Sequence, residues 1–308
     1  MYILIVMFAG VGMLVGGIFL MRFGLKRLLW RRFQRLLQSM TVTAWRGLLV
    51  GTAAAALMQS STAVSLVTIG LVSAEYLTFY QGLGIILGAN IGTCSTVQLL
   101  TISLPDHYFL PLLVLSLIMA VFSQKLRYVS LAVAGLASMF IGLSLISDLI
   151  GQLPQIETII DYLTKERSNP LYGIMGGIIL TFLFQSSSAA TGALMVLAAD
   201  GIIDLTTAAY VVYGNNIGSC LSSVIVGSAA PLAAKRVAAA HIILNVAGAL
   251  IFLPLTELLT SVAAWITADF GAQVAMVHTL FNIISSLAVL PFIRQFSRLI
   301  AALVPGRG

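Results

Sequence analysis

The sequence predicts an all-α integral membrane protein with an inverted-repeat fold, about seven transmembrane helices and two re-entrant helical hairpins. Its composition, its recurring apolar segments and an internal duplication support this prediction. Of the 308 residues, 59% are hydrophobic and 8% are charged, whereas a soluble domain carries roughly 25% charged residues. With a mean hydropathy of +1.05, the composition excludes a disordered chain, a disulfide-rich scaffold and a nucleic-acid-binding protein.

The N-terminal part, residues 1–44, is predicted to hold one transmembrane helix followed by a basic surface helix. The apolar residues 2–20 precede the basic residues Arg22 and Lys26, an order opposite to that of a signal peptide. We therefore expect this helix to be retained. Between residues 22 and 40, six basic residues alternate with Leu, Phe and Trp at helical spacing. This pattern is typical of an amphipathic helix at the cytoplasmic lipid surface.

Eight further apolar stretches follow, and two of them are too long for a single crossing. The stretches lie at 45–72, 80–104, 108–124, 127–149, 171–199, 205–229, 236–256 and 272–293. A crossing needs about 20 residues, whereas 45–72 and 171–199 are longer and carry a Gln-Ser-Ser motif at their middles. We interpret each as two short helical arms that meet at a polar tip. Because non-helical backbone at membrane depth is tolerated only where protein buries it or it lines a cavity, each tip is a candidate wall of a binding site.

The polar motifs recur at a constant offset of 126 residues. Gln-Ser-Ser-Thr-Ala at 59–63 returns as Gln-Ser-Ser-Ser-Ala at 185–189, and Gly-Ala-Asn-Ile-Gly-Thr-Cys at 88–94 returns as Gly-Asn-Asn-Ile-Gly-Ser-Cys at 214–220. We therefore interpret the two cysteines, Cys94 and Cys220, as equivalent positions of two repeats, which makes a disulfide or metal pair the weaker interpretation.

The duplication divides the chain into repeats. With hairpins, each repeat has one hairpin and three spans, an odd number, so the second repeat is inverted relative to the first. Inverted repeats with broken helices at the midplane are typical of secondary transporters that work by alternating access. The predicted units are repeat 1 at 45–150, an extracytoplasmic linker at 151–170, and repeat 2 at 171–308 with a short basic tail.

Charge placement predicts the orientation of the chain. The net charge of +6 arises from basic residues at the ends of apolar stretches, so it indicates topology and not a polyanionic ligand. With two hairpins, 14 of the 16 Lys and Arg residues lie on one side. Two single crossings give the same count, so these residues do not decide between the arrangements, although the acidic residues favour hairpins. We expect a multi-pass protein of the bacterial inner membrane with a cytoplasmic C-terminus.

The doubled motifs have the chemistry to bind ions. Gln-Ser-Ser offers amide and hydroxyl oxygens, which suit hard cations such as sodium by analogy with calcium and magnesium sites. Free N–H groups at a half-helix N-terminus bind anions. The Asn-Ile-Gly motif adds an amide and a glycine that eases unwinding of the next span. The alternative is that small residues let membrane helices pack closely, and we expect this role for the Gly-x-x-x-Gly pairs Gly12/Gly16, Gly47/Gly51 and Gly173/Gly177.

The ionisable residues argue against a proton relay. No Arg or Lys lies at the centre of a predicted span and the acids lie at predicted ends, whereas a relay leaves buried carboxylates or histidines in its path. Sodium coupling is therefore favoured. His241 and His278 are each followed four residues later by Asn245 and Asn282. These pairs support the structure through hydrogen bonds, or they tether the hairpins or contact the substrate.

An intramembrane serine hydrolase is the alternative of another class. Ser60 or Ser187 as nucleophile would need His241 or His278 as base, yet no Gly-x-Ser-x-Gly elbow is present, and one catalytic dyad does not need a duplicated motif. No His-Glu-x-x-His or Cys-x-x-Cys metal site occurs either. We expect no enzyme activity and no organic cofactor.

The doubled motifs resemble those of the sodium/phosphate cotransporter family, the type II group and its bacterial relatives. Residues 236–245 and 277–282 also fit this family, so the resemblance covers nearly the whole chain. It implies sodium-driven uptake of inorganic phosphate, with the two hairpins meeting near the midplane to form the site and sodium as the coupling ion at the same motifs. The residues that it implies for the sodium and phosphate sites are Gln59, Ser60, Ser61, Thr62, Asn90, Thr93, Gln185, Ser186, Ser187, Ser188, Asn215, Asn216 and Ser219.

The sequence departs from the family pattern at two points. Thr62 stands where the family pattern often has Ser, a change that keeps the hydroxyl, and no PhoU-like tail such as many bacterial relatives carry is present. The alternative function is a transporter or exporter of another small anion on the same fold. Expected partners are phosphate, sodium and membrane lipid, with a homodimer left open.

Overall fold

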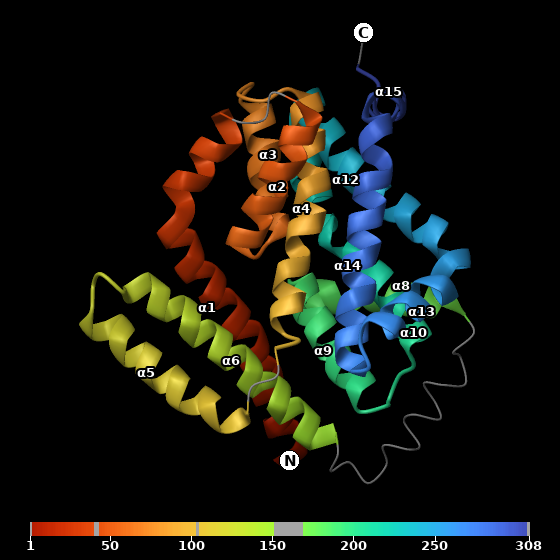
Figure 1. The fold of residues 1–308 in the computed structure, drawn as a ribbon. Coiled ribbons are helices and arrows are strands. Elements are labelled where there is room, and N and C mark those ends of the chain that lie inside the picture. Colours follow the sequence, from red (N-terminus) through yellow and green to blue (C-terminus); the bar gives the residue numbers. More distant parts are fainter. Residues whose placement is uncertain (1, 40–42, 103–104, 151–168, 307–308) are drawn as a thin grey trace.

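The computed structural model describes residues 2–39, 43–102, 105–150 and 169–306. In these ranges the chain is helical and contains no strand (Figure 1). The predicted linker 151–170 and the end of the basic tail lie largely outside them. The α-helices are α1 (Tyr2–Ser39), α2 (Ala44–Met58), α3 (Ser61–Ser73), α4 (Phe79–Leu99), α5 (Phe109–Phe122), α6 (Arg127–Ile150), α8 (Pro170–Phe184), α9 (Ser187–Ala199), α10 (Leu205–Ser219), α11 (Leu221–Ser228), α12 (Leu232–Phe252), α13 (Thr256–Ile266), α14 (Phe270–Val289) and α15 (Ile293–Leu303).

The fold has the helices that a multi-pass membrane protein needs. Among the described residues, five segments are long and apolar enough to cross a bilayer, namely Ile5–Leu28, Phe79–Leu99, Arg127–Leu149, Leu232–Ile266 and Phe270–Leu303. The shorter apolar helices include α2, α3, α8 and α9, which make up the two long stretches of the sequence. The start of α1 and the end of α15 lie at opposite ends of the molecule (Figure 1).

Each long stretch is broken at its Gln-Ser motif. Gln59 ends α2 and Gln185 ends α8, both with φ of 51° in the left-handed region. Ser60 and Ser186 follow in extended backbone. Each hydroxyl accepts a hydrogen bond from the backbone N–H three residues later, that of Ala63 or Ala189. This is the N-cap geometry that serine favours. The motifs therefore end one helix and begin the next, as two helical arms require.

Glycines set the distance between each first arm and the following helix. A methyl group at Gly51 would lie 2.2 Å from the carbonyl oxygen of Ile85 in α4, and one at Gly177 would lie 2.1 Å from that of Val211 in α10. Only glycine allows two helix backbones to approach so closely. The packing role predicted for the Gly47/Gly51 and Gly173/Gly177 pairs is confirmed.

The same prediction is wrong for Gly12 and Gly16. A methyl group at either position would meet nothing within 4 Å. The glycines of α1 that contact α6 are instead at positions 10, 17 and 24. Seven residues are about two helical turns, so these three positions return to one face of α1, whereas Gly12 and Gly16 lie away from it.

Two helix breaks that the sequence predicts, one after the first span and one at the first Asn-Ile-Gly motif, are absent from the structure. Residues 2–39 form one continuous helix, α1, rather than a crossing and a separate surface helix. The span carrying Asn90 stays helical through Thr93 as part of α4, so the unwinding expected there is absent. In the second copy, α10 ends at Ser219 and α11 begins at Leu221. The glycine of the motif permits unwinding, but packing decides where it happens.

Candidate functional site

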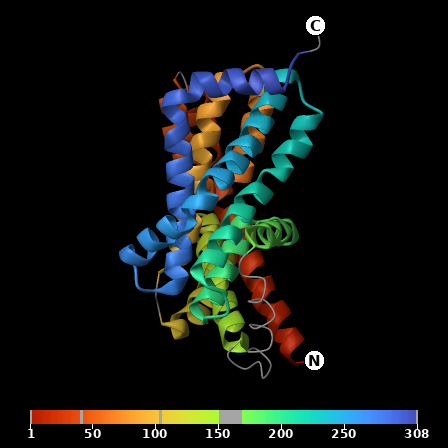
Figure 2. The same cartoon turned by 90° about the vertical axis from the view of Figure 1, so that its right-hand side faces the viewer.

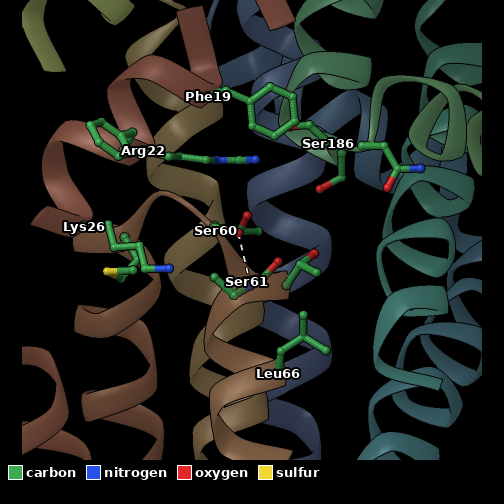
Figure 3. Close-up of a pocket in the computed structure, with 14 residues that line it drawn as sticks. Phe19, Arg22, Lys26, Ser60, Ser61, Leu66 and Ser186 are labelled. Carbon is green, nitrogen blue, oxygen red and sulfur yellow. Dashed lines mark hydrogen bonds between the residues drawn. The ribbon is translucent and has the colours of Figure 1, made fainter. Parts of the chain in front are cut away.

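The two Gln-Ser breaks meet at one cavity of about 430 Å³. Figure 3 shows side chains from α1 and from both breaks directed into it. Of the residues predicted from the motifs, those that line the cavity are Ser60, Ser61, Thr62, Thr93, Gln185, Ser186 and Ser187. Segments 126 residues apart in the sequence thus line one cavity.

Two helix N-termini face this cavity. Helix α3 begins at Ser61 and α9 begins at Ser187, and both residues line the cavity. The first turn of a helix has backbone N–H groups without an intrahelical partner, and the helix dipole places partial positive charge there. Each helix has 13 residues. The cavity is therefore flanked by two helix ends suited to an anion.

Arg22 of α1 contacts both breaks. Its Nε donates a hydrogen bond to the backbone carbonyl of Gln59 over 2.6 Å, and its Nη2 to the hydroxyl of Ser188 over 3.5 Å. Lys26, one turn further along α1, also lines the cavity. Figure 3 shows the Arg22 side chain extending from α1 towards Ser60 and Ser186.

Sequence reasoning placed Arg22 near the end of the first apolar stretch, 3–23, and assigned its charge to topology. Because α1 continues unbroken to Ser39, Arg22 lies within the helix and between the two breaks. The signal available in the sequence was the spacing of Arg22 and Lys26, which are four residues apart and so share a helix face.

The charge of the cavity is positive. Among the described residues that line it, Arg22 and Lys26 are the charged ones, and none is Asp or Glu. Two cations and two helix N-termini in a half-enclosed space produce a potential that attracts anions. The arrangement suits a small oxyanion, since a guanidinium and an ammonium both donate hydrogen bonds to oxygen.

A second cavity of about 230 Å³ adjoins the first. It shares Thr62, Gln185, Ser186 and Ser187 with the first cavity, and its further polar lining comes from Thr181, Ser219 and Ser222. None of the described residues that line it is charged. Neutral hydroxyl and amide oxygens are the ligand type suited to a hard cation (by analogy with calcium and magnesium sites).

The two glutamines are not equivalent in the folded protein. Gln59 is buried, and its Nε2 donates to the hydroxyl of Ser95 in α4 over 3.2 Å, while its Oε1 has no hydrogen-bond partner. Gln185 is exposed to the cavities, and its Nε2 donates to the carbonyl of Phe182. The position equivalent to Ser95 is Leu221, which offers no acceptor.

Three predicted asparagines lie away from both cavities and are buried. Asn215 accepts a hydrogen bond from Thr181 and donates one to Thr191, both over 3.1 Å. Asn90 donates to Asn245 over 3.3 Å, and Asn216 bonds within its own helix. The amides of Asn90 and Asn215 join neighbouring helices, and none of the three asparagines is part of the cavity lining.

The histidine–asparagine pairs lie in the buried framework, and the choice among their expected roles stays a prediction. His241 Nδ1 lies 3.2 Å from the Ser223 hydroxyl, and Asn245 links α12 to α4 through Asn90. The Asn282 amide donates to the carbonyl of His278. All four side chains of the two pairs are buried, and none lines either cavity.

Comparison with known proteins gives matches along the whole chain. The model of the Na⁺/Pi-cotransporter family matches residues 13–148 and 154–291. YqeW of Bacillus subtilis (strain 168) is 30% identical over 307 residues, 100% of each chain. YjbB of Escherichia coli (strain K12), whose provisional name proposes inorganic phosphate export, is 27% identical over 301 residues, 97% of this chain.

The remaining comparisons are partial. The chain spans 55% of the length of YjbB. The sodium-dependent phosphate transport protein 2A of Rattus norvegicus is 36% identical over 59 residues, which are 19% of this chain and 9% of that protein. No solved structure matches.

Proposed function

Because the chain belongs to the Na⁺/Pi-cotransporter family, we propose that it is a sodium-coupled secondary transporter of inorganic phosphate that works by alternating access. It is a multi-pass membrane protein of a transporter family. The observation that carries the proposal is the contact of one arginine with both Gln-Ser breaks at the wall of one cavity.

Phosphate binds in the first cavity. The guanidinium of Arg22 has neutral oxygen partners in this structure, and a phosphate oxygen is a stronger acceptor because the hydrogen bond is then charge-assisted. The planar fork of arginine matches phosphate geometry. Lys26 and the N-termini of α3 and α9 supply the remaining positive potential, with Ser60 and Ser186 hydroxyls alongside.

Sodium binds among the neutral oxygens that adjoin the anion. Thr62, Gln185, Ser186 and Ser187 line both cavities, so a cation and an anion would lie close together. In a partly desolvated site each ion lowers the electrostatic cost of the other. Such mutual stabilisation is a coupling free energy between two sites, which is the requirement for symport.

Alternating access would use the two repeats as inverted units with their hairpins re-entering the membrane. Cysteines introduced near Tyr76 and near Lys125 test the hairpin arrangement. With hairpins, both label only from the cytoplasmic side with an impermeant reagent. Labelling of the two positions from opposite sides would contradict the re-entrant model while leaving the substrate assignment intact.

Phosphate export is the second candidate. It is favoured by YjbB, which matches 97% of this chain and whose provisional name proposes inorganic phosphate export. The same cavity serves either direction, because the sodium gradient and the phosphate gradient determine the net flux. Counterflow measurements from both sides of a vesicle distinguish the two directions.

Labelled-phosphate uptake into proteoliposomes tests the proposal, with an inward sodium gradient compared with a potassium gradient. We expect accumulation with sodium only, and a loss of about tenfold or more in Arg22→Gln, since a hydrogen bond to a charged group is worth about 1.5–3 kcal/mol. Arg27→Gln removes an exposed charge from the same helix and serves as the control. Normal uptake by Arg22→Gln would refute the site, and uptake independent of sodium would refute symport.

A further inference from the structure

A third hollow lies on the outside of the molecule, between α11 and α12. It is a groove of about 260 Å³ whose walls include Val224, Ala238, Ile242 and Val304. Lys235 also lines it and is exposed. The groove thus combines an apolar trough with one cationic side chain.

Exposed apolar surface continues from the groove along α12. Val246 lies one turn beyond the groove residue Ile242 on the same helix face and is 36% exposed. Such side chains on a membrane protein face hydrocarbon. Lys235 lies in the first turn of α12, and a lysine at a helix end extends its ammonium towards the headgroup region.

The C-terminal helix closes one end of the groove. Figure 2 shows α15 lying across the ends of the helices beneath it. Arg236 Nε donates to the carbonyl of Val304 over 3.1 Å, and its Nη2 to that of Ala301 over 3.5 Å, which fixes the end of α15 to α12. Arg294 and Arg298 of α15 are exposed. Arginines on an amphipathic helix at this level are typical of contact with anionic lipid headgroups.

We propose that this groove binds an anionic phospholipid, with one acyl chain in the trough and the headgroup phosphate at Lys235. The charge of Lys235 at the groove favours an anionic over a zwitterionic headgroup. Val224 lines both the groove and the second cavity, so the lipid supports the helix that forms one wall of that cavity. This binding does not depend on the ion that the second cavity holds.

Native mass spectrometry of the full chain tests lipid binding directly. The detergent-purified protein is titrated with phosphatidylglycerol or phosphatidylcholine of equal chain length. We expect a preference for phosphatidylglycerol of about fivefold, the effect of one lysine near an anionic surface. Lys235→Gln abolishes this preference, whereas Lys125→Gln, which removes another exposed lysine, keeps it.

A second pair of variants tests the trough. Ala239→Phe fills the groove, which Ala239 lines, and lowers retention of both lipids. Ala264→Phe adds the same bulk at an exposed position of α13, away from the groove, and has no effect. Equal retention of the two lipids by the unmodified protein, or an unchanged preference in Lys235→Gln, would overturn the proposal. Because Lys235 is exposed, its replacement leaves the fold intact, and phosphate uptake is not part of the readout.

Discussion

Gly177→Ala is the change whose effect the structure determines most directly. The added methyl group would lie 2.1 Å from the carbonyl oxygen of Val211, 2.8 Å from the backbone nitrogen of Asn215 and 2.9 Å from the α-carbon of Gly214. Ordinary contact begins near 3.4 Å, and all three neighbours are backbone atoms of α10 that cannot rotate away. Helix α8 must therefore move away from α10 by about 1 Å at this point.

Gly176→Ala is a matched control one residue away. A methyl group there meets nothing within 4 Å, so the change has only the helix-propensity gain of about 0.5–1 kcal/mol. Both variants share that gain. The difference between them isolates the steric cost of separating α8 from α10, about 1–3 kcal/mol for overpacking of a tight contact.

Thermal unfolding in detergent measures this difference. We expect the Tm of Gly177→Ala to lie roughly 2–10 °C below that of Gly176→Ala, given the usual relation between free energy and Tm. Gln185 follows Gly177 by eight residues, about 12 Å along the helix, so ion uptake should fall in Gly177→Ala as well. Equal Tm values for the two variants would show that α8 and α10 do not meet in this way and would refute the reasoning.

Two further predictions concern the framework around the cavities. Asn215→Ala should destabilise the protein by about 1–3 kcal/mol because the buried Thr181 and Thr191 hydroxyls lose a partner. In the same unfolding assay, the double variant Thr181→Ala, Asn215→Ala should be less destabilised than the sum of the two single variants. Additive losses would contradict the hydrogen-bond network. Burial raises the pKa of the Asp200 carboxyl, at the end of α9 outside the predicted spans, despite a hydrogen bond from Ser147. Above the ordinary carboxyl pKa the folded state then binds more protons than the unfolded state, so stability falls as pH rises through the raised pKa. Asp200→Asn should flatten this dependence, and an unchanged pH profile would exclude the carboxyl as its source.

The sequence alone was sufficient to predict the helix class and the position of both breaks. A Gln-Ser motif in the middle of an apolar stretch that is too long for one crossing indicates that the helix is broken at the motif. Serine caps a helix N-terminus through its hydroxyl, so Ser60 and Ser186 mark where α3 and α9 begin. The constant offset of the motifs also predicted that Gly51 and Gly177 would have corresponding roles, and each lies against a backbone carbonyl of the following helix.

Tertiary structure decided which residues face the cavities. Helical periodicity defines a face but not the neighbour on that face, so Arg22 could not be distinguished from a topological charge until α1 was seen beside both breaks. For the same reason, the glycines of α1 that pack against α6 are the three spaced seven residues apart, and not Gly12 and Gly16. The two copies diverge where packing partners differ. Gln59 is buried against Ser95, whereas Gln185 has Leu221 at the equivalent place and stays open to both cavities.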